Sequence, residues 1–343
     1  MAVPSQHSNT SVQVDYSIAI LSSRETAQTL QRCLDTTIQG LGERRALIDV
    51  LINGNHDLSL QVRQILQDYE NTASVPENIS IRLWEKSFAD KASAWNSYIH
   101  QIWPLSQKCF FLDGYAFPHK NSFNDMAKML DQNPYHHAVS AVPTQGRSAP
   151  LLRKAMADTS GLHGNCHALR GEVVSRFRDI SFHLPQGLYR VDSLIGAALK
   201  YNLDPSHHRW RNGRIGVCLD ASWDIPNEQS FIQQVKQFVK RRFRQSRGVL
   251  ENHAIGEIFS IRKQPLSALP EQASELMSRC QRKTLKGKWA LIKKDPLLLY
   301  YFLFSSAADH SSLKSESATL VFGLNTPHHA ENQKIEDDFE KVA

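Results

Sequence analysis

Short apolar segments alternate with segments of helical periodicity over the first half of the chain, and this alternation restricts the fold more than any other feature. The helical segments carry apolar residues at every third or fourth position, as between Leu30 and Leu41. Alternation of this kind builds a mostly parallel β-sheet with helices on both faces. The sequence therefore predicts an α/β domain with strands at Tyr16–Leu21, Ala46–Ile52, Ile79–Leu83, Lys108–Asp113 and His137–Val142.

Polar turns follow three of these expected strands at the point where each strand ends. The turns are Ser22–Glu25, Asn53–Asp57 and Asp113–Tyr115. Sheets of this type bind ligands beyond the carboxyl ends of their strands. We therefore expect a ligand site where the three turns meet.

The pattern loosens beyond residue 150. A helix is expected at Asp192–Leu199 with Asp192 as its N-cap, then a strand at Arg214–Leu219 and a basic helix at Gln229–Arg247. Residues 256–305 have helical character. We expect four regions: a flexible arm at 1–14, the α/β domain at 15–250, a helical C-terminal extension at 251–324 and a disordered tail at 325–343.

Composition and short motifs exclude several functional classes. A net charge of +6 over 343 residues does not demand a nucleic-acid partner, and none is expected. The five cysteines form no CxxC pair, which excludes a zinc ribbon and a thioredoxin-type site. P-loop, GxGxxG and GxSxG motifs are absent from the sequence. Without a signal-peptide pattern or an apolar run of about 20 residues, a cytoplasmic location is expected.

Five segments, taken in order, resemble family 2 glycosyltransferases over about residues 15–250. They are IAILSSRETAQTLQRCL, IDVLINGNHDLS, FFLDGYAFPHKNSFNDMAKML, GLHGNCHALR and YRVDSLIGAAL. No single segment is specific, but the ordered set is stronger than any one of them. The resemblance implies a nucleotide-binding domain of the GT-A type. It also implies transfer of a sugar, with inversion, from a nucleotide-sugar donor to a hydroxyl of a carbohydrate or other acceptor.

The resemblance implies that Asp113 binds a divalent cation, Mn²⁺ or Mg²⁺, against the donor diphosphate. Such a cation neutralises charge on the leaving group and prefers carboxylate oxygens. The second Asp of the family's usual Asp-x-Asp triplet is Tyr115 here. Three alternatives therefore stay open: a further ligand such as His207 or His208, a metal-independent site, and an inactive site.

Asp192 matches the residue that removes the acceptor proton in inverting members of the family, a role that a positioned carboxylate can perform. The family's preceding acid is Val191 here. Helix capping is the simpler interpretation of Asp192, and the two roles are compatible.

Further residues match the family's nucleotide-binding positions. The first donor loop corresponds to Ser22, Arg24 and Glu25, although the family's usual Pro and Asn positions are Leu21 and Arg24 here. Turn chemistry alone also explains polar residues at such positions. The resemblance further implies nucleotide contacts from Asn53, Asp57 and Asn96, the last within FADKASAWNSYI beside Lys91. His163 and His167 are expected to be structural.

The basic helix and the segment Trp289–Phe304 could each contact the inner face of a membrane, and this possibility stays open. For the basic helix the preferred interpretation is a solvated basic face. For Trp289–Phe304 the preferred interpretation is a buried core helix. A non-catalytic GT-A-like module that binds nucleotide, carbohydrate or protein is an alternative function, favoured by Tyr115. A nucleotidyltransferase would need a Gly-rich basic loop after the first strand, where this chain has SSRETAQ.

Overall fold

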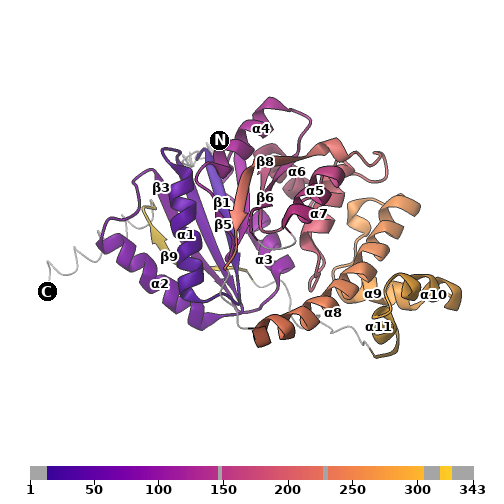
Figure 1. Cartoon of the computed structure of the whole chain (residues 1–343). Coiled ribbons are helices and arrows are strands. Elements are labelled where there is room, and N and C mark those ends of the chain that lie inside the picture. The colour runs from indigo at the N-terminus through magenta and orange to yellow at the C-terminus, as the bar shows by residue number, and fades with distance from the viewer. Residues whose placement is uncertain (1–13, 146–148, 227–230, 305–316, 327–343) are drawn as a thin grey trace, which may run out of the picture.

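The computed structural model describes residues 14–145, 149–226, 231–304 and 317–326. Its centre is a nine-stranded sheet in the order β5-β8-β6-β7-β4-β1-β2-β3-β9, with helices on both faces (Figure 1). The strands are β1 Tyr16–Ser22, β2 Ala46–Asn53, β3 Ile79–Lys86, β4 Lys108–Asp113, β5 Phe117–Pro118, β6 Ala138–Pro143, β7 Cys166–Arg170, β8 Ile215–Asp224 and β9 Thr319–Leu324.

The parallel strands β4, β1, β2 and β3 form the half of the sheet that carries the polar turns. Their register pairs Leu21 with Asp113, and Ser22 with Ile52, so that the ends of β1, β2 and β4 lie level with one another. Strand β7 runs antiparallel between β4 and β6, which makes the sheet mixed. The three polar turns therefore meet at one edge, as the sequence predicts.

Alternate residues of each strand are buried against opposite faces, as the two-residue period of a strand requires. In β1, Ile18 and Ile20 belong to the core under one set of helices, and Ala19 and Leu21 to the core on the other side. The first set is α1 Ala27–Leu41, α2 His56–Asn71 and α4 Ser122–Gln132. The second is α3 Lys91–Ser97, α6 Gly171–Asp179, α7 Val191–Lys200, α8 Phe231–Gly256 and α9 Ala273–Gln281.

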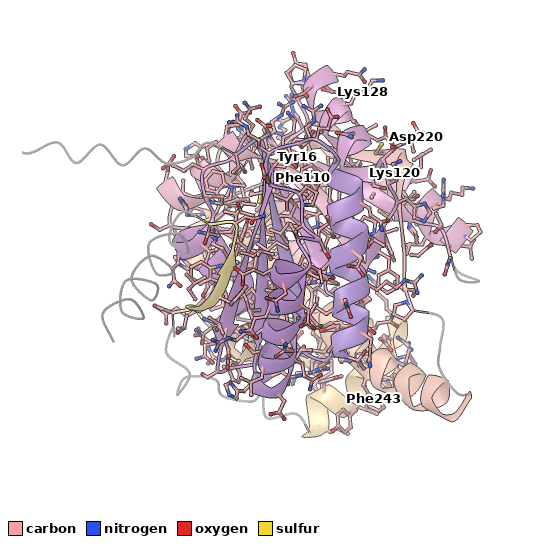
Figure 2. All side chains as sticks on the ribbon, turned by 90° about the vertical axis from the view of Figure 1, so that its left-hand side faces the viewer. Tyr16, Phe110, Lys120, Lys128, Asp220 and Phe243 are labelled. Carbon is pink, nitrogen blue, oxygen red and sulfur yellow. The ribbon has the colours of Figure 1, made fainter. Side chains whose placement is uncertain are left out.

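Aromatic rings fill the first of these cores. Tyr16 and Phe110 (labelled in Figure 2) meet edge to face with centroids 5.0 Å apart. Phe123 packs on Phe110 in the same way. Arg32 lies over the ring of Phe117, where α1 crosses β5. These contacts fix α1 and α4 against the sheet and so fix the loops that end at the polar edge.

All five strands predicted in the first half are present, with ends that differ by a few residues. The late strand and the helix near 192 are present as β8 and α7, and the basic helix as α8. One local prediction is wrong: Arg190 rather than Asp192 is the N-cap of α7, and no side chain caps it. Asp192 lies instead in the first turn, where the helix dipole favours a negative charge.

The predicted C-terminal extension contains the end of α8 together with α9, α10 Leu285–Lys294 and α11 Leu298–Phe304, and these helices form a lobe beside the sheet (Figure 1). The chain then returns as β9 and pairs antiparallel with β3, a strand that the sequence analysis misses. The predicted arm and tail lie almost entirely outside the described residues. Among the described helices, none combines the length and apolar character needed to cross a bilayer.

The predicted solvated face of α8 is partly wrong. Arg242 pairs with Asp295 at 3.0 Å, which joins α8 to the segment before α11, and Arg247 pairs with Glu251 at 2.8 Å within α8. The side chains of Lys236, Lys240 and Arg241 lie outside the description. The predicted core helix at 289–304 is also half wrong: Leu291 and Leu298 are buried, but Trp289, Leu299, Tyr300 and Leu303 are exposed.

Candidate active site

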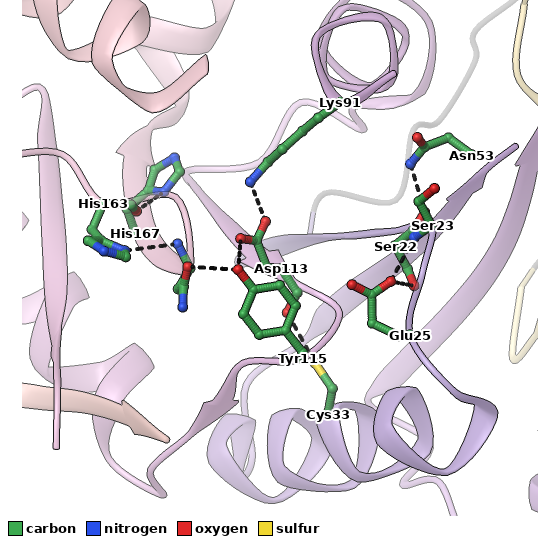
Figure 3. Close-up of polar contacts among 11 residues, drawn as sticks. Ser22, Ser23, Glu25, Cys33, Asn53, Lys91, Asp113, Tyr115, His163 and His167 are labelled. Atoms are coloured by element: carbon green, nitrogen blue, oxygen red, sulfur yellow. Dashed lines mark hydrogen bonds and ion pairs between the residues drawn. The ribbon is translucent and has the colours of Figure 1, made fainter. Parts of the chain in front are cut away.

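The loop after β1 folds around the carboxylate of Glu25. Oxygen Oε2 of Glu25 accepts hydrogen bonds from Ser22 Oγ at 2.6 Å and from the backbone N–H groups of Ser23 and Arg24 at 2.7 and 2.9 Å. Asn53, at the end of β2, donates from Nδ2 to the Ser22 carbonyl at 2.7 Å. The structure thus brings Ser22, Glu25 and Asn53 together in one turn (Figure 3).

Asp113 ends β4 in the middle of this edge and is only 8% exposed. Its Oδ1 is contacted by the ammonium of Lys91, and its Oδ2 accepts a hydrogen bond from the hydroxyl of Tyr115 at 3.1 Å (Figure 3). The same hydroxyl lies 3.4 Å from Asn165 Oδ1. Asp113 and burial raise the pKa of Tyr115, so Tyr115 stays a neutral donor.

Lys91 is the first residue of α3, and the cap of that helix fixes its position. Asp90 accepts from the backbone N–H groups of Ala92 and Ser93, and also from Gly187 N at 3.1 Å. Burial is the largest single influence on the pKa of Lys91 and lowers it, but the carboxylates of Asp113, Asp192 and Glu25 together raise this pKa by more, so the net shift is upward. The site therefore holds a permanently charged cation among three carboxylates.

Asp192 reaches the same place from α7. A Cβ added to Gly164 would lie 3.2 Å from Lys91 Nζ and 3.8 Å from Asp192 Cγ, so this glycine separates the two charged groups. Only a residue without a side chain fits there without moving Lys91. Asp192 is half-buried at the edge where Asp113 and Lys91 lie.

The two histidines of the neighbouring turn are structural, in line with the sequence interpretation. His167 Nδ1 donates to the His163 carbonyl at 2.9 Å, and its ring stacks on Phe111. Burial lowers the pKa of His167 to about 3, so the ring is neutral. His163 Nδ1 accepts from Asn165 N at 3.3 Å and holds the Gly164 turn in place.

Three of the predicted nucleotide-binding side chains lie apart from this cluster. Asn96 uses its whole amide on the backbone of Leu184, donating at 2.9 Å and accepting at 2.8 Å. Asp57 is exposed in the first turn of α2, and Arg24 is exposed on the loop after β1. Their nucleotide contacts stay predictions.

Sequence reasoning leaves Lys91, Tyr115 and Asn165 out of the proposed site. The sequence signal nearest to Lys91 is Asp90, whose position as N-cap fixes where α3 begins. Tyr115 occupies the position of the second carboxylate in the Asp-x-Asp pattern. Its hydroxyl donates a hydrogen bond to Asp113 instead of supplying a negative charge. Asn165 carries no comparable signal.

The donor atoms around Asp113 do not form a cation site as they stand. Both of its carboxylate oxygens are engaged, and the described residues contain no group of three or more His, Cys, Asp or Glu arranged to hold a metal ion. His207 is bonded to Asp204 at 2.8 Å and His208 to Asn202 at 3.1 Å within their own turn. A cation on Asp113 would lie beside the ammonium of Lys91 and would be repelled by it.

No protein-family profile matches the sequence, and a search of curated proteins finds no relative. Among solved structures, the chain is similar to the mannosyltransferase PcManGT from Pyrobaculum calidifontis, in complex with GDP-Man and Mn²⁺. The TM-score is 0.53 at 17% identity, over 84% of this chain and 81% of that one.

Two further structures have lower scores. S. aureus TarS 1–349 has a TM-score of 0.47 at 12% identity, over 88% of this chain and 75% of that one. Glucosyl-3-phosphoglycerate synthase from Mycobacterium tuberculosis, with Mn²⁺, UDP-glucose and glycerol 3-phosphate, has 0.44 at 14%, over 69% and 78%.

The order and direction of the strands, the helices on both faces and the similarity to the mannosyltransferase agree with the fold expected from the sequence. The chain has the mixed, largely parallel sheet of GT-A glycosyltransferases, with a helical C-terminal region beside it.

Proposed function

We propose that this chain is an inverting glycosyltransferase that uses a nucleotide-sugar donor, of the kind found in family 2. The observation that carries the proposal is the half-buried Asp192 carboxylate beside the Lys91–Asp113 pair, at the ligand-binding edge of a GT-A sheet. A base and a cation placed together are what displacement of a nucleoside diphosphate requires.

In this proposal Asp192 removes the proton from the acceptor hydroxyl as the hydroxyl attacks the anomeric carbon. The bond from that carbon to the diphosphate breaks on the opposite face, which inverts the configuration. The turn of Ser22, Glu25 and Asn53 holds the nucleotide, with Asp57 and Arg24 at its rim. Asn96 acts indirectly, because its amide fixes the backbone at Leu184, in the segment that leads to α7.

The divalent cation predicted on Asp113 is a separate hypothesis. It is motivated by the resemblance and by the Mn²⁺ named with the mannosyltransferase structure. The contacts of Asp113 with Lys91 and Tyr115 do not favour it, so no step of the proposed mechanism passes through a metal.

The alternative is a module that binds a nucleotide or carbohydrate without turnover. Tyr115 in place of the second carboxylate favours it, since that change removes a ligand that a metal-dependent enzyme would need. This module would bind nucleoside diphosphates but would neither transfer nor hydrolyse the donor sugar.

Two measurements test these proposals. Thermal shift with UDP, GDP, CDP and dTDP, each with and without Mn²⁺, identifies the base. A ligand at about 100 times its Kd adds roughly 2.7 kcal/mol. A thermal shift that is the same with and without Mn²⁺ would contradict metal binding by Asp113. No shift with any of the four would count against nucleotide binding altogether.

The second measurement is turnover of the matching nucleotide sugar by Asp192→Asn. We expect the rate to fall by about 10²–10⁴-fold, the usual contribution of a general base. Asp158→Asn, an exposed carboxylate on α5 Ala149–Thr159, is the matched control and should change little. Transfer by Asp192→Asn at the normal rate would overturn the assignment of the base.

A further inference from the structure

The C-terminal lobe contains a strongly basic cavity that the proposed reaction does not use. It has a volume of about 500 Å³ and lies between the turn Glu257–Ile261 and helix α9. Four cationic side chains line it against one carboxylate, that of Glu257. The four are Arg262, Arg279, Arg282 and Lys283.

Glu257 holds only two of these cations. It accepts from Arg262 at 2.6 Å and from Lys283 at 2.8 Å, and these two bonds lower its pKa to about 2. In the part of the chain that the structure describes, Arg279 and Arg282 have no ion-pair partner. The cavity therefore keeps a net positive charge and two guanidinium groups suited to phosphate oxygens.

Large apolar side chains stand next to the cavity in sequence and are unusually exposed. Ile261, beside Arg262, is 74% exposed, and Leu285, two residues beyond Lys283, is 83% exposed. Trp289 is 62% exposed and lies one turn after Leu285 on the same face of α10. Lys286 and Lys293 flank them on the exposed side of this helix.

We propose that this surface docks on a bilayer containing anionic phospholipids. A lipid phosphate binds to Arg279 and Arg282, while Ile261, Leu285 and Trp289 enter the boundary between headgroups and acyl chains. Exposed Trp and Leu combined with Lys and Arg are typical of helices that lie in a membrane interface.

The lobe that carries the docking surface is hydrogen-bonded to the segment that leads to the proposed catalytic base. Glu251 of α8 accepts hydrogen bonds from the backbone N–H groups of Tyr189 and Arg190, directly before α7. Arg247 donates to the Gly187 carbonyl as well as to Glu251. Docking of the lobe therefore fixes the orientation of the Asp192 helix relative to the bilayer.

Co-sedimentation of the full chain with vesicles tests the proposal. We expect binding to phosphatidylcholine vesicles that contain phosphatidylglycerol, weakening as salt is raised, and little binding to phosphatidylcholine alone. The double variant Arg279→Glu/Arg282→Glu should bind more weakly by on the order of tenfold or more. The control Arg63→Glu/Lys128→Glu makes the same charge change at exposed positions on α2 and α4 and should bind as the wild type. Lys128 lies at the opposite end of the molecule from Phe243 of α8 (Figure 2).

The apolar contribution has its own variant. Leu285→Ser/Trp289→Ser should weaken binding several-fold while the dependence on salt stays the same, since the charges are unchanged. The difference in fluorescence between wild type and Trp289→Phe should shift to the blue when anionic vesicles are added. Circular dichroism melting checks that each variant folds. If Arg279→Glu/Arg282→Glu does not fold, Arg279→Gln/Arg282→Gln is used in its place.

Four results would overturn the proposal: no sedimentation with either vesicle, equal binding to both, an equal loss in the control variant, or unchanged binding of the arginine variants. A thermal shift with inorganic phosphate or pyrophosphate that depends on Arg279 and Arg282, without vesicle binding, would instead assign the cavity to a soluble anion.

Discussion

Two buried carboxylates of the same sheet are neutralised in different ways. Asp49, in the middle of β2, accepts two hydrogen bonds from Arg82 at 2.7 and 3.1 Å and one from Trp84 Nε1 at 2.8 Å. Asp113, at the end of β4, is contacted by one ammonium and one hydroxyl. A guanidinium fork fixes both oxygens in place, whereas an ammonium is a point charge on a flexible chain.

The difference in burial follows from position along the strand. The side chain of Asp49 is 0% exposed and that of Arg82 is 21% exposed, but the side chain of Lys91 is 39% exposed. Burial raises the pKa of Asp49 more than Arg82 and Trp84 lower it, so its charge depends on that pairing. We infer that the first pair is a closed structural contact and that the second can open for a ligand while the fold persists.

The largest expected effect comes from breaking the closed pair. Arg82→Leu leaves the carboxylate of Asp49 buried with only Trp84 as a donor, and we expect a loss of about 3–5 kcal/mol in the free energy of unfolding. Urea denaturation measures it. Asp49→Leu/Arg82→Leu is the control, because removal of both charges should recover much of the loss. A loss below about 1 kcal/mol for the single variant would show that Asp49 is not closed from water.

A second prediction concerns His167, which is the second residue of β7 and is buried. Its folded pKa of about 3 lies below the ordinary value of 6.5, so the unfolded chain binds the proton more readily. The stabilisation is therefore complete above pH 6.5 and is lost as the pH falls towards 3. The slope should reach about 1.4 kcal/mol per pH unit.

The measurement is the free energy of unfolding of His167→Gln from pH 7 down to pH 4, compared as a slope because the substitution also shifts the absolute stability. The slope should decrease relative to wild type. A slope unchanged by His167→Gln would mean that water reaches this ring.

Hydrophobic periodicity was sufficient to predict β1, β2, β3, β4, β6 and β8, and with them the edge where Ser22, Asn53 and Asp113 meet, because these depend on local patterns. Long-range pairing was not predictable in this way. The strand β9 joins β3 from more than 200 residues away, and Asn96 is bonded to Leu184, 88 residues along the chain. The contact of Lys91 with Asp113 depends on how α3 packs beneath β4, which no local pattern encodes.

The smallest effect on stability is expected from opening the second pair. Lys91→Met should cost about 1 kcal/mol or less, because the side chain of Asp113 is 12% exposed, so water can replace the lost ammonium while Tyr115 still donates to the carboxylate. It should weaken binding of the nucleoside diphosphate by about tenfold, the loss of one charge-assisted hydrogen bond.

Lys108→Met provides the matched control for Lys91→Met. Lys108 begins β4, at the opposite end of this strand from Asp113, and pairs with Asp131 at 3.0 Å. The substitution of Lys108 therefore removes a lysine–aspartate pair without changing the polar edge. Diphosphate binding, measured by titration calorimetry, should be unchanged. If Lys91→Met cost as much stability as Arg82→Leu, the Asp113 pair would be as closed as that of Asp49. If the Lys91→Met variant bound diphosphate normally, the ammonium of Lys91 would contribute to the fold but not to ligand binding. A small loss of stability together with a large loss of affinity is the combination that only an opening pair predicts.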